Sequence, residues 1–270
     1  MQAGIFSRTY AAKGEAVFAA MKADGFSAAQ LNLSSLGLQS LPAALDEAVL
    51  LNAKADAARH DLQLMGLSGT YNMAHPDPAY RSGQRLKFAH VLRAARLMGI
   101  DVVTLCTGSR DANNMWAHHP DNHSAEAGQV FRSELDAVLK MAGGLVLAIE
   151  PEPGNVVRDA KVARALLDDI RAPNLKIILD AANLLSPETL PRQKDIMAEA
   201  FDLLGADTVQ AHAKDIDLQG CVTAPGQGAV DLKMFVAGLR RVNYTGPLVA
   251  HGFAEKDTLQ AGHYLGDLLA

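Results

Sequence analysis

The sequence predicts a single (β/α)8 barrel, an α/β fold in which helices surround a closed sheet of parallel strands. Short apolar segments alternate with helical patterns along the chain, and this alternation is typical of a parallel sheet covered by helices. We count eight strand-then-helix units in 270 residues, and a barrel of this kind needs about 250. An open nucleotide-binding sheet usually has a glycine-rich first turn, whereas the first turn here is Ser7-Arg8-Thr9-Tyr10. One domain, 1–270, is therefore expected.

Each expected strand is a short apolar run, and most of the runs are rich in branched side chains. Runs of this kind are typical of strands that are buried on both faces, as in a parallel sheet. The expected strands are 3–6, 28–33, 66–71, 102–106, 145–150, 175–180, 208–212 and 247–251. The fifth run, Leu145 to Glu150, ends in a carboxylate and is stopped by Pro151 and Pro153.

Between the strands, apolar side chains recur with the spacing of one helix face. Positions i, i+3, i+4 and i+7 are apolar within 88–98, 131–142, 162–170, 232–239 and 261–269. The longer irregular stretches, 72–85, 107–124 and 214–228, all follow expected strands. A barrel keeps its active-site loops in those places.

Composition narrows the function classes. The formal net charge is −5, so the sequence has no excess of basic residues that would bind phosphates, which argues against nucleic acid as a partner. Two cysteines suit a reducing compartment, and no apolar run approaches the roughly 18 residues of a membrane span. The first residues lack the pattern of a secretion signal. We expect a soluble, cytoplasmic protein without a membrane partner, for which a homo-oligomer is compatible with the sequence.

Polar residues cluster where the apolar strands end, and the strand starts carry no comparable set. In a closed parallel barrel all carboxyl ends meet on one face. Glu150, Asp180, His212 and His251 each take the last position of an expected strand. The other polar or aromatic residues that follow strand ends are Asn72, His75, Thr107, Arg110, Trp116, His118, His119, Glu152, Asn183 and Lys214. These side chains are expected to surround one cavity.

Two carboxylates and two imidazoles form a mixed oxygen and nitrogen ligand set. Such a set suits one divalent Mn²⁺, Co²⁺, Zn²⁺ or Fe²⁺ ion, and Mg²⁺ is served less well by imidazole. We therefore expect Glu150, Asp180, His212 and His251 to be metal ligands. The alternative is a network in which the same side chains only form hydrogen bonds with one another.

Four segments resemble the xylose isomerase-like TIM barrels: Ala148-Ile-Glu-Pro-Glu152, Ile177-Ile-Leu-Asp-Ala-Ala-Asn183, Gln210-Ala-His-Ala-Lys-Asp215 and Pro225-Gly-Gln-Gly-Ala-Val-Asp231. That superfamily holds sugar isomerases and epimerases, inosose dehydratases and DNA repair enzymes of the endonuclease IV type. The segments Thr107-Gly-Ser-Arg-Asp111 and Met115-Trp-Ala-His-His-Pro-Asp-Asn122 are similar to a branch described only as sugar phosphate isomerase/epimerase. The resemblance spans nearly the whole chain.

The resemblance also implies roles for individual residues. It makes Glu150, Asp180 and His212 metal ligands, and Asn183 falls where ketose 3-epimerases have a substrate-binding histidine. Those epimerases end strand eight with a glutamate that is both a ligand and one of two catalytic carboxylates, but this chain has His251 there. Because a metal-bound imidazole is a poor proton acceptor, we expect proton chemistry on one face of the substrate only.

The leading hypothesis is a metal-dependent isomerase or epimerase that acts on a keto- or aldo-sugar or a cyclic polyol ketone through an enediolate. The alternative is a lyase of the inosose dehydratase or 3-keto-glycoside lyase type, which uses the same enolate chemistry. Cleavage of abasic DNA would require more metal ligands and a basic rim, and a non-catalytic sugar-binding barrel would leave the ligand set unexplained.

Candidate residues follow from this hypothesis. The candidate catalytic residues are Glu152, Glu150, His75 and Lys214. The candidate substrate-binding residues are Asn72, Thr107, Arg110, Trp116, His118, His119 and Asn183. Trp116 would form an apolar wall for the sugar.

Overall fold

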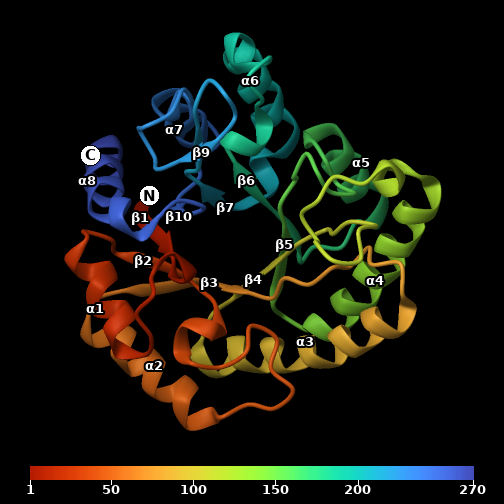
Figure 1. Ribbon diagram of the computed structural model, residues 1–270, viewed down its shortest axis with the longest axis horizontal. Helices are drawn as coiled ribbons and strands as arrows, with labels where there is room; N and C mark the ends of the chain where they lie inside the picture. Colours follow the sequence, from red (N-terminus) through yellow and green to blue (C-terminus); the bar gives the residue numbers. More distant parts are fainter.

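The computed structural model describes residues 1–270 and contains the predicted barrel. Eight parallel strands close in the order β1-β10-β7-β6-β5-β4-β3-β2, and Figure 1 looks into this ring. The strands are β1 Gln2–Phe6, β2 Ala28–Leu31, β3 Gln63–Ser68, β4 Val102–Leu105, β5 Val146–Ile149, β6 Leu175–Asp180, β7 Thr208–His212 and β10 Pro247–Ala250. The predicted fold class is confirmed.

Eight α-helices form the outer layer around the strands (Figure 1). They are α1 Glu15–Ala23, α2 Glu47–Arg59, α3 Pro78–Met98, α4 Ala125–Ala142, α5 Ala160–Ile170, α6 Gln193–Leu204, α7 Leu232–Arg241 and α8 Thr258–Leu269. Short 3₁₀ helices are η1 Ser7–Thr9, η2 Leu33–Leu36, η3 Pro120–His123, η4 Ala182–Leu184, η5 Leu190–Arg192, η6 Gly205–Asp207 and η7 Glu255–Asp257. Helix α8 packs against β1, so the two ends of the chain lie side by side.

The helices begin where side chains satisfy their free backbone N–H groups. Asp46, Asp77, Ser124, Asp159 and Asp231 accept hydrogen bonds from the first turns of α2, α3, α4, α5 and α7, respectively. Such caps stabilise a helix by about 1 kcal/mol each. They fix the point at which each loop from the carboxyl ends of the strands enters its helix.

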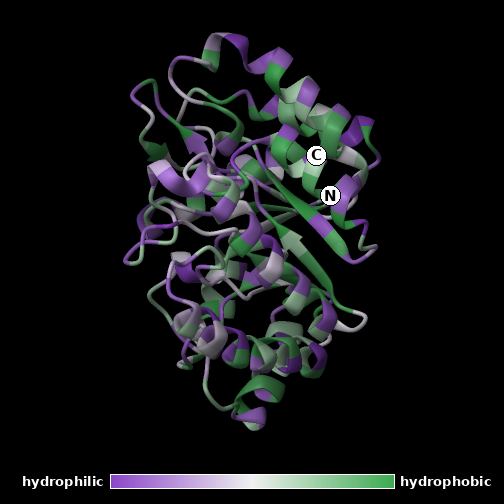
Figure 2. Ribbon diagram, turned by 90° about the vertical axis from the view of Figure 1, so that its right-hand side faces the viewer, coloured by the Kyte–Doolittle hydropathy of each residue, from purple (hydrophilic) through white to green (hydrophobic).

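The strands form the centre of one hydrophobic cluster of 67 buried residues, which runs from Ala3 to Leu265. Figure 2 shows the apolar strands in the middle and helices with mixed apolar and polar colouring around them. This pattern agrees with strands that are covered on both faces. None of the helices combines the length and hydropathy needed to cross a lipid bilayer.

The prediction of the third strand at 66–71 is wrong in position, because β3 is Gln63–Ser68 and starts and ends three residues earlier. The strand begins with the exposed Gln63, whose N–H donates to the Ser27 carbonyl, so its start carries no apolar signal. At its other end the chain leaves the sheet at Gly69. A Cβ on Gly69 would lie 2.6 Å from the Phe88 ring, so this turn packs closely on α3.

A small antiparallel hairpin within 214–228 was not expected. It consists of β8 Asp215–Ile216 and β9 Val222–Thr223, strands too short to show an alternating pattern. The buried Asp215 carboxylate holds the following turn by accepting backbone hydrogen bonds from Gly226, Gly228 and Val230. A Cβ on Gly228 would lie only 2.2 Å from Asp215 Oδ1, so this position requires glycine.

Candidate metal centre and active site

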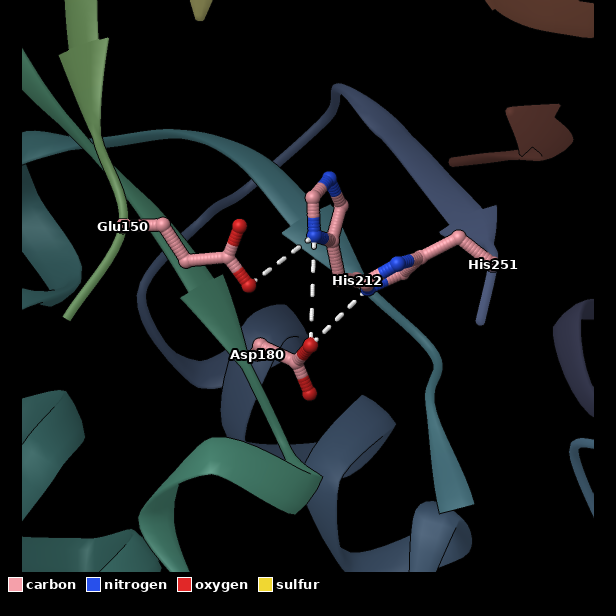
Figure 3. A group of neighbouring side chains, drawn as sticks. All are labelled: Glu150, Asp180, His212 and His251. Atoms are coloured by element: carbon pink, nitrogen blue, oxygen red, sulfur yellow. Dashed lines mark hydrogen bonds and ion pairs between the residues drawn. The ribbon is translucent and has the colours of Figure 1, made fainter. Parts of the chain in front are cut away.

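Four ligand-type side chains meet at the carboxyl ends of four neighbouring strands. Glu150 directly follows β5, Asp180 ends β6, His212 ends β7 and His251 directly follows β10. Asp180 and His212 are paired in the register of β6 and β7. One ligand atom from each of the four residues lies within 4.8 Å of all the others, and Figure 3 shows the side chains converging from separate strands.

The spacing of these atoms fits a metal ion. His212 Nδ1 lies 3.2 Å from Glu150 Oε1 and 3.9 Å from Asp180 Oδ2, and His251 Nε2 lies 3.0 Å from Asp180 Oδ2 (Figure 3). Bonds of about 2.0–2.2 Å to a central ion would separate neighbouring ligands by about 3 Å and opposite ligands by about 4.4 Å. With small adjustments of its side chains, the cluster therefore has the spacing to hold a divalent ion. Two of its ligands, Asp180 and His212, are buried.

Asn183 and Lys214 connect the two carboxylates of the cluster. Asn183 Nδ2 donates to Glu150 Oε1 at 2.8 Å, and its Oδ1 accepts from Lys214 Nζ at 2.5 Å. The same Nζ lies 3.2 Å from Asp180 Oδ2. Because each carboxylate has a fixed partner, its orientation toward the centre is set before any ligand binds.

Local charges control the protonation of Asp180 and Lys214. Burial alone would raise the pKa of Asp180, but Lys214, His251 and His212 together hold it well below its ordinary value. Burial would lower the pKa of Lys214, but Asp180, Glu150 and Glu152 raise it above its ordinary value. Asp180 therefore stays anionic and Lys214 stays cationic at neutral pH.

Glu152 differs from the Glu150 and Asp180 carboxylates because its side chain has no hydrogen-bond partner. It lines the cavity next to the cluster. Burial, helped by the nearby Glu150 carboxylate and opposed by Lys214, raises the pKa of Glu152 to about 8. A carboxylate with a pKa near neutrality and no fixed partner is suited to accept and return a proton.

His212 is oriented by a residue that the sequence analysis did not single out. Its Nε2 lies 2.8 Å from Oε1 of Gln30, a buried residue of β2. Gln210 Nε2 lies 3.0 Å from the same ring atom and also donates to Gln30 Oε1. Since Gln30 Oε1 can only accept, we assign the ring proton to Nε2. The Nδ1 lone pair is then free to face the cluster.

This arrangement predicts that Gln30→Ala lowers the affinity for a divalent ion about 10–100-fold, as loss of a partner behind a metal-bound histidine does. Titration of the metal-free protein with Mn²⁺ or Co²⁺ measures the effect. Gln30→Glu is the matched control, because its carboxylate keeps an acceptor for Nε2–H. Wild-type affinity in Gln30→Ala would show that Gln30 does not orient His212.

The cluster opens into a cavity of about 170 Å³. Seven residues from the first four strands and the turns after them contribute to its lining and were not predicted: Phe6, Arg8, Gln30, Ser68, Thr70, Thr104 and Leu105. Of the predicted residues, Glu150, Glu152, His212, Lys214, His251 and Trp116 also line it. The seven residues that were not predicted also lie at or near the carboxyl ends of their strands, but their hydroxyl, amide, guanidinium and apolar side chains are not typical metal ligands.

Other predicted residues lie in the loops after β3 and β4, outside the cavity lining. Asn72 Oδ1 accepts from the Ser109 N–H at 2.9 Å, and Thr107 Oγ1 accepts from the Val157 N–H at 3.2 Å. Arg110 pairs with Glu126 at 3.0 Å. These contacts connect the two loops and the turn after β5. A role for Asn72, Thr107 or Arg110 in binding substrate stays a prediction.

The three loop histidines also have partners within the protein. His75 stacks on Tyr80 with ring centroids 3.9 Å apart, and its Nδ1 accepts from the Asp77 N–H. His119 Nδ1 accepts from the Asp121 N–H at the start of η3, and the His118 ring lies 5.9 Å from that of His123. None of the three lines the cavity. Their proposed roles in catalysis or binding stay predictions.

Comparisons with known proteins agree with this architecture. A family model described as xylose isomerase-like TIM barrel matches residues 18–266, whereas a search of curated proteins found no match. The structure of 3-keto-D-glucoside 4-epimerase from E. coli is 17% identical, with a TM-score of 0.76 and 99% of each chain covered. That of a probable 3-DHS dehydratase from Bacillus anthracis is 12% identical, with a TM-score of 0.74 over 98% of this chain and 99% of that chain.

A longer chain contains a similar barrel. It is a fusion of a xylose isomerase-like TIM barrel with 4-hydroxyphenylpyruvate dioxygenase, 16% identical with a TM-score of 0.71. The match covers 97% of this chain and 41% of the fusion protein. At such identities the three structures establish a common fold.

Proposed function

Because this chain belongs to the xylose isomerase-like TIM barrel family, we propose that it is a divalent-metal-dependent isomerase or epimerase of a small keto- or aldo-sugar or a cyclic polyol ketone. One observation carries the proposal. A cluster with the spacing of a metal site and an unpartnered carboxylate, Glu152, face the same cavity. The similar fold of a 3-keto-D-glucoside 4-epimerase supports it.

Glu150, Asp180, His212 and His251 are the proposed ligands. Their mixed oxygen and nitrogen donors favour Mn²⁺, Co²⁺, Zn²⁺ or Fe²⁺ over Mg²⁺. A bound ion would supply Lewis acidity, which weakens the C–H bonds next to a substrate carbonyl. Asn183 would hold Glu150 in place through the hydrogen bond from its Nδ2.

Glu152 is the proposed base. Its carboxylate would take the proton from the carbon next to the carbonyl, while the C–H electron pair forms the C=C bond of an enediolate and the carbonyl oxygen gains negative charge. Lys214 is held as a cation by Asp180 and Glu150, so it would balance that charge rather than accept the proton. Return of the proton to the former carbonyl carbon, together with transfer of the hydroxyl proton from one enediolate oxygen to the other, completes an isomerisation.

His251 leaves the cavity with one carboxylate that is neither a proposed ligand nor paired, Glu152. Proton transfer is therefore expected on one face of the enediolate, which favours isomerisation over two-face epimerisation within the proposed class. Incubation with Mn²⁺ and a panel of keto-sugars and inososes in D₂O, followed by NMR, should show deuterium delivered to a single face. A C3-epimerised product with deuterium on the inverted face would show that two-face chemistry occurs and that this interpretation of His251 is wrong.

A lyase is the second candidate, because one base is also sufficient to form an enolate that expels a β-substituent. The similar fold of a probable 3-DHS dehydratase supports this alternative. Mass spectrometry of the same D₂O reactions separates the two candidates. An isomerase conserves the mass of the substrate apart from exchanged hydrogen, whereas a dehydratase removes water.

A further inference from the structure

Arg8 is a cation of the cavity lining that no carboxylate neutralises. It lies in η1, immediately after β1, and its exposed side chain contributes to the same lining as Glu150 and Glu152. The other lysine or arginine of the lining, Lys214, is held by Asp180 and Asn183. Arg8 makes no side-chain hydrogen bond or ion pair within the protein, so its planar set of N–H donors is available to a ligand.

The charges around the cavity favour an anionic ligand once a metal ion is present. The two proposed carboxylate ligands, Glu150 and Asp180, balance the two charges of a divalent ion. Arg8 and Lys214 then leave two positive charges in the lining against the single carboxylate of Glu152. The loaded cavity therefore has an excess of positive charge even when Glu152 is ionised.

A second polar group of the lining has no partner. Thr104 Oγ1 is buried without a hydrogen bond, which is costly unless a ligand or water supplies one. The nearby hydroxyls of Ser68 and Thr70 are 3.4 Å apart, a long contact that leaves both able to bond elsewhere. This part of the lining therefore offers neutral donors and acceptors to substrate hydroxyls, and Arg8 supplies the charge.

We propose that Arg8 binds a carboxylate of the substrate, so that the substrate class is acidic keto-sugars rather than neutral ones. A guanidinium donates two parallel hydrogen bonds to a carboxylate. This inference rests on the proposed sugar chemistry of the site, because it assigns the part of the same substrate that lies away from the carbonyl.

D-fructose and D-fructuronate test the inference, because they differ only in a terminal CH₂OH or carboxylate group. Calorimetric titration of the Mn²⁺-loaded protein should show D-fructuronate binding about 10-fold tighter or more, as expected of a charge-assisted hydrogen-bond pair. Arg8→Gln should remove the preference, and Arg8→Lys should retain part of it, because a lysine keeps the charge but not the paired donors. All three proteins should bind Mn²⁺ equally.

Equal affinity for the two sugars, or a preference that survives in Arg8→Gln, would overturn the inference. Tighter binding of D-fructose 6-phosphate than of D-fructuronate would overturn the assignment to a carboxylate. The same titrations without metal separate this inference from the proposed function. A wild-type protein that takes up no Mn²⁺ contradicts the metal-dependent function, whereas an Arg8-dependent preference for D-fructuronate in that protein still supports the carboxylate site.

Discussion

Glu152→Gln will lower kcat by about 100-fold or more, while the variant keeps its fold and its metal. The amide has nearly the same shape as the carboxylate but cannot accept a proton. The Glu152 carboxylate has no hydrogen-bond partner in the protein, so the substitution breaks no side-chain hydrogen bond there. Steady-state kinetics with the substrate found in the D₂O screen measures the loss, and solvent deuterium incorporation at the reacting carbon should fall with kcat.

Glu188→Gln is the matched control for this experiment. It makes the same chemical change at an exposed glutamate outside the cavity, so kcat should stay at the wild-type value. Metal content and thermal unfolding of both variants show whether the active-site change is local. Full turnover and full exchange in Glu152→Gln would show that another group acts as the base, which would contradict the mechanism proposed for Glu152.

The barrel was predictable because its strands are buried on both faces. The runs of β5 and β6 consist mostly of branched apolar residues, and a carboxylate directly follows β5 and ends β6, so composition and position both indicate a buried strand. β3 begins with the exposed Gln63, and its pairing depends on neighbouring strands rather than on its own sequence. The hairpin β8–β9 depends on the buried Asp215 carboxylate and the close approach of Gly228, which no periodicity indicates.

The strand-end rule brought together the acidic and histidine residues of the cluster, because parallel strands in a barrel must end on one face. It did not separate side chains that end strands from side chains further along the loops. His75, for example, follows β3 by several residues and packs on Tyr80 instead of the cavity. Gln30 lies near the end of β2, and Arg8 lies just after β1. The role of each in the site depends on residues from strands distant in the sequence, so the local sequence does not reveal it.

Asp180→Ala and His212→Ala should each lower kcat/KM by about 10³-fold or more, because loss of a metal ion removes several kcal/mol of stabilisation from the transition state. Asp180 is also the partner of Lys214 and His251, so its loss disturbs the whole cluster. Chelator treatment of the wild-type protein should cause a comparable loss that added Mn²⁺ reverses. Added Mn²⁺ should restore little activity in either variant.

The metal content of the purified protein tests the central claim most directly. Elemental analysis of protein prepared without chelator should find about one divalent ion per chain in the wild type, as four ligands around one centre predict. The same measurement should find little metal in Asp180→Ala and His212→Ala when circular dichroism shows that both are folded. Equal metal content in the wild type and both folded variants would contradict the assignment of the cluster as the metal site.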